Sequence, residues 1–332
     1  MYKEVDFENF LGFNFDLLID ARSPREYTHA HIKNAKNYYA LNDDEFEEIG
    51  TLYKKNKGLA KIKGASYICK NMSEHINKLY QNYKIGSLIG IYCARGGKRS
   101  KALALILVEL GYRVVRLEGG YKAYRSYVSA FFQKELKIDF LCLCGNTASG
   151  KSELIQTLDN ALNLEKLANH QGSSFGKIYG EQPSQKAFED ELFYFLKDYS
   201  YKTCFIEAES RQIGNLTLPL NLYNAMQKGR KIWCECALNL RVERILKIYA
   251  HIEKSYFYEC VEKISPYISK DFKTILCQNY ENNDLKSCVL MLIKYYDKVY
   301  KKPQKIDFYL KNDNPKQAKE ELVKINFTSL KN

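Results

Sequence analysis

Short apolar runs alternate with amphipathic helical patterns along the first part of the chain. Runs typical of buried strands occupy residues 17–19, 88–92 and 113–117. Helical spacing of apolar residues fills most of the intervals, at 24–28, 43–54, 59–83 (with one or two breaks), 101–110 and 121–136. Alternation of this kind favours a parallel sheet with helices on both faces.

The same alternation begins again at residue 138. Apolar runs at 138–144, 202–206 and 231–237 are typical of buried strands. A helix is expected from Glu153, with one apolar face made of Leu154, Ile155, Leu158 and Leu162. From residue 239 the spacing is helical through about residue 301. We therefore expect an α/β protein in three parts: 1–136, a second α/β domain at 137–238, and a mainly helical part at 239–332 packed on that second domain.

The turn after the strand at 138–144 has the spacing of a phosphate-binding P-loop. Its residues are Gly145, Asn146, Thr147, Ala148, Ser149, Gly150, Lys151 and Ser152. Such a loop aims backbone N–H groups at phosphate oxygens, while the lysine reaches the outer phosphates and the serine holds Mg²⁺. Acidic residues are expected after the next strand, where the chain has Glu207, Glu209, Ser210 and Arg211.

A second loop of phosphate-binding size lies upstream, between the strand at 88–92 and the helix at 101–110. It begins with Cys93 and continues through Arg95, Gly96, Gly97, Lys98 and Arg99. Positive neighbours and a helix N-terminus favour the thiolate, which is the nucleophilic form of cysteine. We therefore predict Cys93 as the catalytic nucleophile within an anion-binding loop. The plainer interpretation, an inert buried thiol, stays open because the chain has ten cysteines.

Other charged residues have competing interpretations. Asp20 and Arg22 are expected to brace the sheet edge rather than to touch substrate. Arg241 and Arg244 lie one helical turn apart, and they either face an anionic ligand or form a solvated face. The acids Glu207 and Glu209 either contact metal or water, or hold Arg211.

The net charge of +12 bears on the choice of partner. Such a surplus attracts polyanions, nucleic acid above all, although a composition rich in lysine, asparagine, isoleucine and tyrosine explains it equally well. No apolar run approaches the roughly 18 residues that span a bilayer. The first residues lack a signal-peptide pattern, and the cysteines lack zinc-site spacing. We expect a cytoplasmic protein with free thiols and no membrane partner.

Particular segments resemble known families. Residues 20–26 (DARSPRE), the Cys93 loop and residues 117–121 (LEGGY) resemble a rhodanese domain. With the P-loop half and the segments at 168–176 (ANHQGSSFG) and 206–214 (IEAESRQIG), the chain resembles the tRNA 2-selenouridine synthase family up to about residue 250. One segment and three single positions depart from the usual patterns: AHIKNA at 30–35 replaces GHIPGA, and Ala148, Gln171 and Ala208 replace glycine, arginine and aspartate.

This resemblance implies a transferase that acts on the thiolated wobble uridine in the anticodon loop of tRNA. It implies geranylation of the sulfur from geranyl diphosphate, and then replacement of that sulfur by selenium from selenophosphate. No tightly bound cofactor is implied, Mg²⁺ is an optional ligand at Ser152, and a supplier of selenophosphate is a second partner.

The resemblance also suggests how the two loops divide these donors. Diphosphate is expected in the P-loop, and selenophosphate at Cys93 through a persulfide-like intermediate. Further ligand contacts are expected from His170, Gln171, Ser173 and Ser174. The alternatives are a P-loop kinase or ATPase with a regulatory rhodanese domain, a tRNA sulfurtransferase, and a phosphatase that uses the C-x5-R loop.

Overall fold

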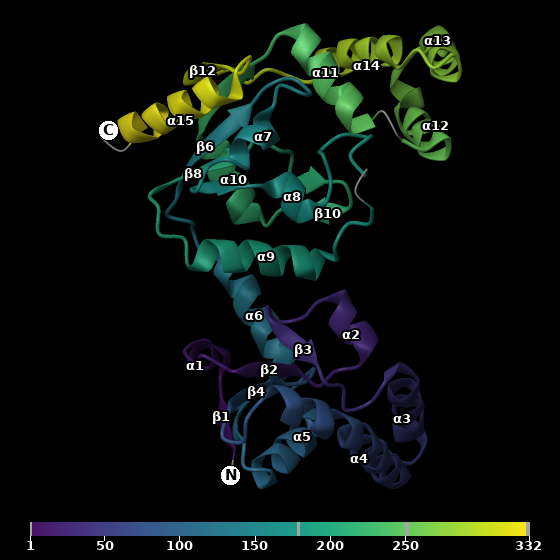
Figure 1. The fold of residues 1–332 in the computed structure, drawn as a ribbon, viewed down its shortest axis with the longest axis vertical. Helices are drawn as coiled ribbons and strands as arrows, with labels where there is room; N and C mark the ends of the chain where they lie inside the picture. Colours follow the sequence, from purple (N-terminus) through teal and green to yellow (C-terminus); the bar gives the residue numbers. More distant parts are fainter. Residues whose placement is uncertain (1, 178–179, 250–251, 330–332) are drawn as a thin grey trace. The chain divides into compact units, whose positions relative to one another are not determined.

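The chain folds into two compact units, each built around its own parallel sheet. The structure is a computed structural model that describes residues 2–177, 180–249 and 252–329. Contacts divide the chain into Met1–Phe131 and Phe132–Asn332, and Figure 1 shows the elements of both units. Each unit is considered by itself below.

The first unit has a five-stranded sheet in which all strands are parallel. Its order is β1 (Lys3–Val5), β5 (Arg113–Leu117), β4 (Leu88–Tyr92), β2 (Leu17–Asp20) and β3 (Ala35–Asn37). The three strands expected from the apolar runs are confirmed. The edge strands β1 and β3 have three residues each, which is too short for a periodic pattern to reveal.

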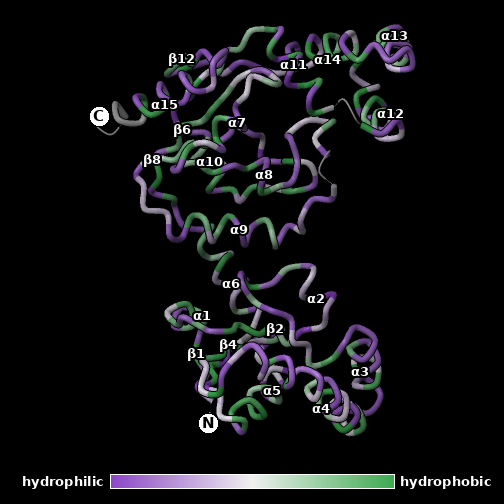
Figure 2. Tube along the Cα trace, viewed as in Figure 1, coloured by the Kyte–Doolittle hydropathy of each residue, from purple (hydrophilic) through white to green (hydrophobic). Residues whose placement is uncertain are grey.

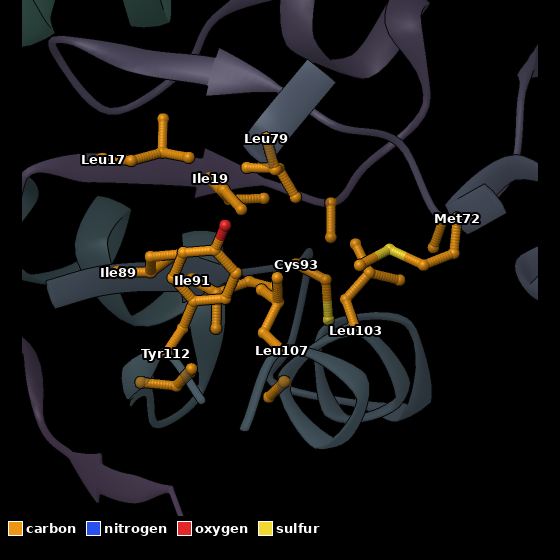
Figure 3. Packing of buried hydrophobic residues seen from close by; sticks show 14 of the residues in the cluster. Leu17, Ile19, Met72, Leu79, Ile89, Ile91, Cys93, Leu103, Leu107 and Tyr112 are labelled. Atoms are coloured by element: carbon orange, nitrogen blue, oxygen red, sulfur yellow. The ribbon is translucent and has the colours of Figure 1, made fainter. Parts of the chain in front are cut away.

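Helices cover both faces of this sheet, as the alternation predicted. They are α1 (Phe7–Leu11), α2 (Pro24–His29), α3 (Asp43–Lys55), α4 (Lys57–Asn82), α5 (Lys98–Glu109) and α6 (Gly120–Gln133). On one face, Met72 of α4 and Leu103 of α5 pack against Ile91 and Cys93 in a single apolar cluster (Figure 3). On the other face, α1 and α6 meet through Phe7 and Tyr124, whose ring centroids lie 4.9 Å apart.

The second unit has a parallel sheet of the same size. Its order is β12 (Phe308–Lys311), β11 (Arg230–Glu235), β6 (Asp139–Cys144), β8 (Thr203–Glu207) and β7 (Ala161–Leu162). A small hairpin, β9 (Gln212–Ile213) and β10 (Leu216–Thr217), lies outside it. The expected strands are confirmed. The helical C-terminal region is also confirmed, but it contributes the edge strand β12, which we had not expected.

The helices of this unit differ from expectation at one place. We expected the helix after the P-loop to include Leu158 and Leu162, but α7 spans only Lys151–Ile155. The chain turns after α7, where the backbone N–H and the hydroxyl of Thr157 both bond to the carbonyl of Leu154. Leu162 then enters β7 and pairs with β8. The turn is needed because β7 must run parallel to its neighbour in the sheet.

Further helices cover the two faces of the sheet. They are α8 (Leu164–Ala168), α9 (Gln185–Lys197), α10 (Leu220–Lys228) and α15 (Pro315–Ser329). Leu322 of α15 packs with Leu154 of α7 and with Ile232 of β11 in one buried cluster. The P-loop strand β6 therefore has covered neighbours on all sides, which fixes the position of the turn that follows it.

A separate group of helices follows β11. It consists of α11 (Leu238–Tyr249), α12 (Lys254–Ile264), the 3-10 turn η1 (Ser265–Tyr267), α13 (Lys270–Glu281) and α14 (Leu285–Val299). Hydrophobic and hydrophilic residues alternate along these helices (Figure 2), as expected for amphipathic helices with their own core. None of the helices in the described parts of the chain is both long enough and apolar enough to cross a membrane.

Candidate functional sites

Cys93 lies at the carboxyl end of β4, with its side chain directed into a loop of hydrogen-bond donors. Its Sγ accepts hydrogen bonds from the backbone N–H of Gly97 (3.1 Å) and the hydroxyl of Ser100 (3.2 Å). The residue is only 2% exposed. Donors aimed at the sulfur stabilise negative charge on it, as a nucleophilic thiol requires.

The backbone of this loop is held by the turn that follows β5. Tyr121 N–H donates to the carbonyl of Cys93 (2.8 Å), and Lys122 N–H donates to that of Ala94 (3.0 Å). Gly120 has φ +60°, and a Cβ there would lie 2.1 Å from the Cys93 carbonyl oxygen. Only glycine permits this approach. The LEGGY segment therefore positions the cysteine loop.

The basic residues of the loop have unequal roles. Arg99 forms an ion pair with Glu26 at 2.5 Å, and its guanidinium lies 4.7 Å from the centre of the Phe46 ring. Arg95 and Lys98 are exposed. The loop thus offers an anion two exposed cations, whereas the arginine of the C-x5-R spacing is already paired.

Asp20 and Arg22 brace the sheet edge, which confirms the expectation for them. Arg22 donates to Asp20 at 2.5 Å, and its guanidinium lies 3.8 Å from the centre of the Tyr121 ring. The hydroxyl of Tyr92, the residue before Cys93, donates to the same carboxylate at 2.8 Å. Burial raises the pKa of Tyr92 well above its ordinary value, so that this donor keeps its proton.

The interior of the P-loop is occupied by its own lysine. Lys151 Nζ donates to the carbonyls of Gly145 (2.9 Å) and Asn146 (3.3 Å). It also lies 5.8 Å from the centre of the Tyr300 ring. The Ser152 hydroxyl donates to Glu165 Oε2 at 2.6 Å. Glu165 was missed by sequence reasoning, because it follows a strand of only two residues.

The outside of the P-loop is held by the C-terminal part of the chain. Arg241 Nε donates to the carbonyl of Thr147 (2.9 Å), and the Asn312 amide donates to that of Ser149 (2.8 Å). In a trans peptide, C=O and N–H point in opposite directions. The N–H groups of the Thr147–Ala148 and Ser149–Gly150 peptides therefore point away from these clamps, as an anion-binding loop requires.

The interpretation of Arg241 and Arg244 as a solvated face was wrong, because neither residue is exposed, whereas contact with an anionic ligand stays a prediction. Arg241 is 6% exposed and is paired with Asp297 at 2.6 Å. Arg244 donates to the carbonyl of Ala148 (3.2 Å) and to the Cys236 sulfur (2.9 Å). Both arginines donate hydrogen bonds to the P-loop backbone, because its carbonyls face outward and need donors.

Ala148 adopts a backbone conformation that suits glycine. Its φ is +60°, in the left-handed region, where a Cβ costs about 1–2 kcal/mol. The departure noted at this position therefore carries strain. The hydrogen bond from Arg244 to its carbonyl helps to hold the residue there.

Carboxylates gather beside the P-loop at the carboxyl edge of the sheet. Glu207 is fully buried, with Oε2 accepting from Leu164 N–H at 2.8 Å, and Oε1 has no partner among the described residues. Burial and then the neighbouring Glu165 raise the pKa of Glu207 to about 8. The same two causes raise the pKa of Glu209, although Lys151 opposes them. These groups hold protons near neutral pH.

Two residues of the predicted set turn away from these carboxylates. The Arg211 Nε donates to the carbonyl of Leu218 at 3.5 Å, so the acids do not hold it. The Ser210 hydroxyl donates to the carbonyl of Gln212. Both side chains belong to the hairpin β9–β10.

The polar segment at 170–176 lies against the same carboxylates. His170 N–H donates to the carbonyl of Glu165 at 3.0 Å, and burial lowers the pKa of its imidazole. A Cβ on Gly172 would lie 2.8 Å from a Glu209 oxygen. Gln171 N–H closes the turn on the carbonyl of Gly176 at 3.0 Å.

The other end of this segment faces the C-terminal helices. Ser173 lines the same cavity as Thr147 of the P-loop, and Ser174 interacts with Tyr296 of α14. The segment is thus part of the P-loop site, on which β6, β7 and β8 converge. Cys93 belongs to the first unit, whereas the P-loop and this segment belong to the second.

Family models match both units. A rhodanese-like domain matches residues 5–127, and the tRNA 2-selenouridine synthase AAA domain matches residues 138–322. The chain belongs to the tRNA 2-selenouridine synthase family. The resemblance noted from the sequence is thereby confirmed.

Relatives within the family align with most of the chain. The tRNA 2-selenouridine synthase of Pseudomonas savastanoi pv. phaseolicola is 35% identical over 238 residues, which cover 70% of this chain and 65% of that protein. That of Psychromonas ingrahamii is 33% identical, covering 72% and 67%. The match thus spans about two thirds of the relatives' length. A solved N-terminal domain from Clostridium difficile 630 is 38% identical, covering 38% of this chain and 98% of that one, with a TM-score of 0.34.

Proposed function

We propose that this protein is a tRNA-modifying transferase that converts a wobble 2-thiouridine into 2-selenouridine through a geranylated intermediate. One observation carries the proposal: the chain has two differently built anion loops in separate units. One presents a thiol held by two donors, and the other presents a lysine without a nucleophile. The proposal is supported by the family relatives that bear the name tRNA 2-selenouridine synthase.

The first step is alkylation at the P-loop. The thiocarbonyl sulfur attacks C1 of geranyl diphosphate, the C1–O bond breaks, and its electron pair leaves on the diphosphate. The uracil ring loses its N3 proton, which restores neutrality of the base. Lys151 leaves the Gly145 and Asn146 carbonyls to stabilise the charge that develops on the leaving group. Positioning matters more than base strength here, because sulfur is already a good nucleophile.

Among the described residues no group of three or more acidic, histidine or cysteine side chains is arranged to hold a metal ion, so a magnesium ion here would need one or two carboxylates together with phosphate oxygens of the ligand. The Ser152 hydroxyl and the Glu165 and Glu209 carboxylates are oxygen ligands of the kind that Mg²⁺ prefers. When bound, the ion would neutralise charge on the diphosphate. Ser152 would then exchange its bond to Glu165 for the ion.

The second step is selenium transfer at Cys93. The selenium of selenophosphate attacks C2 of the base, and geranylthiolate leaves and takes up a proton. The Cys93 thiolate then attacks phosphorus, and the P–Se electron pair remains on the selenium of the base. Water releases phosphate from the cysteine. This route replaces the expected persulfide-like intermediate. That intermediate would form by attack of the Cys93 thiolate on selenium, and phosphorus would then have to leave as phosphite unless an outside oxidant took part.

The charge of the chain supports tRNA as the partner. A surplus of +12 favours a polyanion, and affinity that rests on phosphate contacts falls steeply with salt. The wobble base lies in a single-stranded loop, so that little base pairing must be broken to present its sulfur.

Nucleoside analysis by mass spectrometry tests the proposal. Thiolated tRNA is incubated with the full chain and with geranyl diphosphate, selenophosphate or both. We expect geranylthiouridine with the first donor, unchanged thiouridine with the second, and selenouridine with both. Unchanged thiouridine in every tube, from folded protein, would refute the proposed function. Direct selenation without the geranyl donor would refute the two-step order.

A further inference from the structure

An apolar cavity lies among helices α11–α14, and Thr147 of the P-loop is one of the residues that line it. Thr147 and Ser173 line one end of it, and aliphatic or aromatic side chains line the rest. The cavity volume, without the open solvent at its mouth, is about 60 Å³. Among the described residues that line it, none is charged. The cavity therefore suits an uncharged, apolar group attached to something held at the P-loop.

The residues of helix α14 that line the cavity lie at increasing distances from the P-loop. At its carboxyl end, Tyr300 contacts Lys151, and Asp297 holds the arginine that binds the Thr147 carbonyl. Tyr296 lines the cavity near this end, and Cys288 lines it two turns further away. Eight residues of helix advance about 12 Å. The α14 residues that line the cavity thus extend away from the phosphate loop over at least that length.

We propose that this cavity holds the hydrocarbon chain of the prenyl diphosphate whose phosphates bind in the P-loop. The inference rests on the proposed function, and it assigns the prenyl subsite to α11–α14. An extended chain advances about 1.2 Å per bond. The eight bonds from the ester oxygen to the end of a geranyl chain therefore span roughly 10 Å. A dimethylallyl chain is half as long and would reach fewer of the residues that line the cavity.

A nucleobase fits the same space less well. A buried base needs hydrogen-bond partners for its edge, and most of the residues that line this cavity have purely apolar side chains. The rings of Phe257 and Tyr280 are already stacked on each other with centroids 3.8 Å apart. They form a wall, and neither ring offers both faces for intercalation.

The test is equilibrium binding to the full chain. The probes are geranyl diphosphate, dimethylallyl diphosphate and inorganic diphosphate. The variants are Leu292→Trp, which fills the cavity, and Leu290→Trp on the same helix, where the native side chain is 37% exposed and does not line the cavity. Cys288→Phe shortens the far end as a second cavity variant.

For wild type we expect geranyl diphosphate to bind roughly 100-fold more tightly than dimethylallyl diphosphate, since each buried methylene adds affinity. Leu292→Trp should weaken the geranyl ligand at least tenfold and leave inorganic diphosphate within twofold, which also reports a folded P-loop. Cys288→Phe should reduce the ratio of the affinity for geranyl diphosphate to the affinity for dimethylallyl diphosphate. Leu290→Trp should change nothing.

Two outcomes separate the inference from the proposed function. If wild type binds geranyl diphosphate no better than inorganic diphosphate, the proposed function fails. If wild type prefers the geranyl ligand but both cavity variants bind it normally, only the assignment of the cavity is overturned. Loss of tRNA affinity in the cavity variants with normal geranyl binding would also overturn it, in favour of the base.

Discussion

The two anion loops of this protein are supported in different ways. The Cys93 loop is held by its own unit: the turn after β5 binds its backbone, and Ser100 and Gly97 bind its sulfur. The P-loop is held from far along the chain, by Arg241, Arg244 and Asn312. The Cys93 loop is thus held entirely by residues of its own unit. The P-loop depends on residues 94 to 163 positions downstream, so that the C-terminal region helps to build the phosphate site.

Removal of the Cys93 thiol should have the largest effect, and it separates the steps assigned to the two loops. Cys93→Ser should lower selenium transfer on the order of 10³-fold or more, since it removes the nucleophile. Geranylation should stay within twofold, because the P-loop does not use this residue. Nucleoside mass spectrometry measures both products. Cys69→Ser, at an exposed cysteine, is the control. Equal loss of both steps in folded Cys93→Ser protein would contradict the separation.

The reciprocal variant removes the charge of the P-loop. Lys151→Ala should slow geranylation by 10²–10³-fold, on the order seen when an anion-stabilising donor is removed. Selenium transfer to tRNA that is already geranylated should be unaffected. Lys166→Ala, an exposed lysine on α8, serves as the control. Wild-type geranylation at saturating geranyl diphosphate would show that Lys151 does not stabilise the leaving group.

The buried carboxylate of Glu207 should make the stability of the P-loop unit depend on pH. The folded-state pKa of Glu207, about 8, lies above its ordinary value of 4.5, so the folded state holds the proton more tightly. Its contribution to stability should therefore fall as pH rises between these values, by about 1.4 kcal/mol per pH unit. Denaturant melts of the full chain between pH 5 and pH 8 measure the decline. Glu207→Gln should flatten it. An unchanged slope in that variant would assign the effect elsewhere.

The long-range clamp should matter for stability as well as for geometry. Arg241→Met leaves Asp297 and the Thr147 carbonyl without their donor, and it should destabilise the second unit by about 2 kcal/mol. Geranylation should fall with it, whereas selenium transfer by the first unit should not. Denaturation of Arg241→Met, Asp297→Asn and the double variant gives the coupling energy. Additive effects would show that the pair contributes nothing beyond its separate residues.

The smallest effect is expected at the strained residue of the P-loop. Ala148→Gly removes a Cβ from a left-handed conformation and should stabilise the unit by about 1 kcal/mol. Thermal unfolding measures the gain, with Ala187→Gly in helix α9 as a control that should destabilise by a similar amount. A loss of stability in Ala148→Gly would mean that the side chain makes contacts that outweigh its strain.

Local patterns predicted much of this molecule. Buried strands and glycine-rich turns lie within a few residues of each other, so both loops could be found from spacing alone. The edge strand β12 and the short helix α7 could not, because tertiary pairing overrode the apolar periodicity at Leu162. Glu165 and the role of Arg241 also escaped prediction. Glu165 meets Ser152 only because the chain turns after α7, and Arg241 meets Asp297 only when α11 and α14 pack together.

The separation of the two chemical steps is tested most directly by complementation. Thiolated tRNA is first treated with Cys93→Ser protein and geranyl diphosphate, is purified, and is then given to Lys151→Ala protein with selenophosphate. The account predicts that selenouridine forms in this sequence, although neither variant alone makes it with both donors. It also predicts that the reverse order of the two proteins gives only the geranylated base. Failure of the first order, with both variants folded, would contradict the claim that each loop performs its own step.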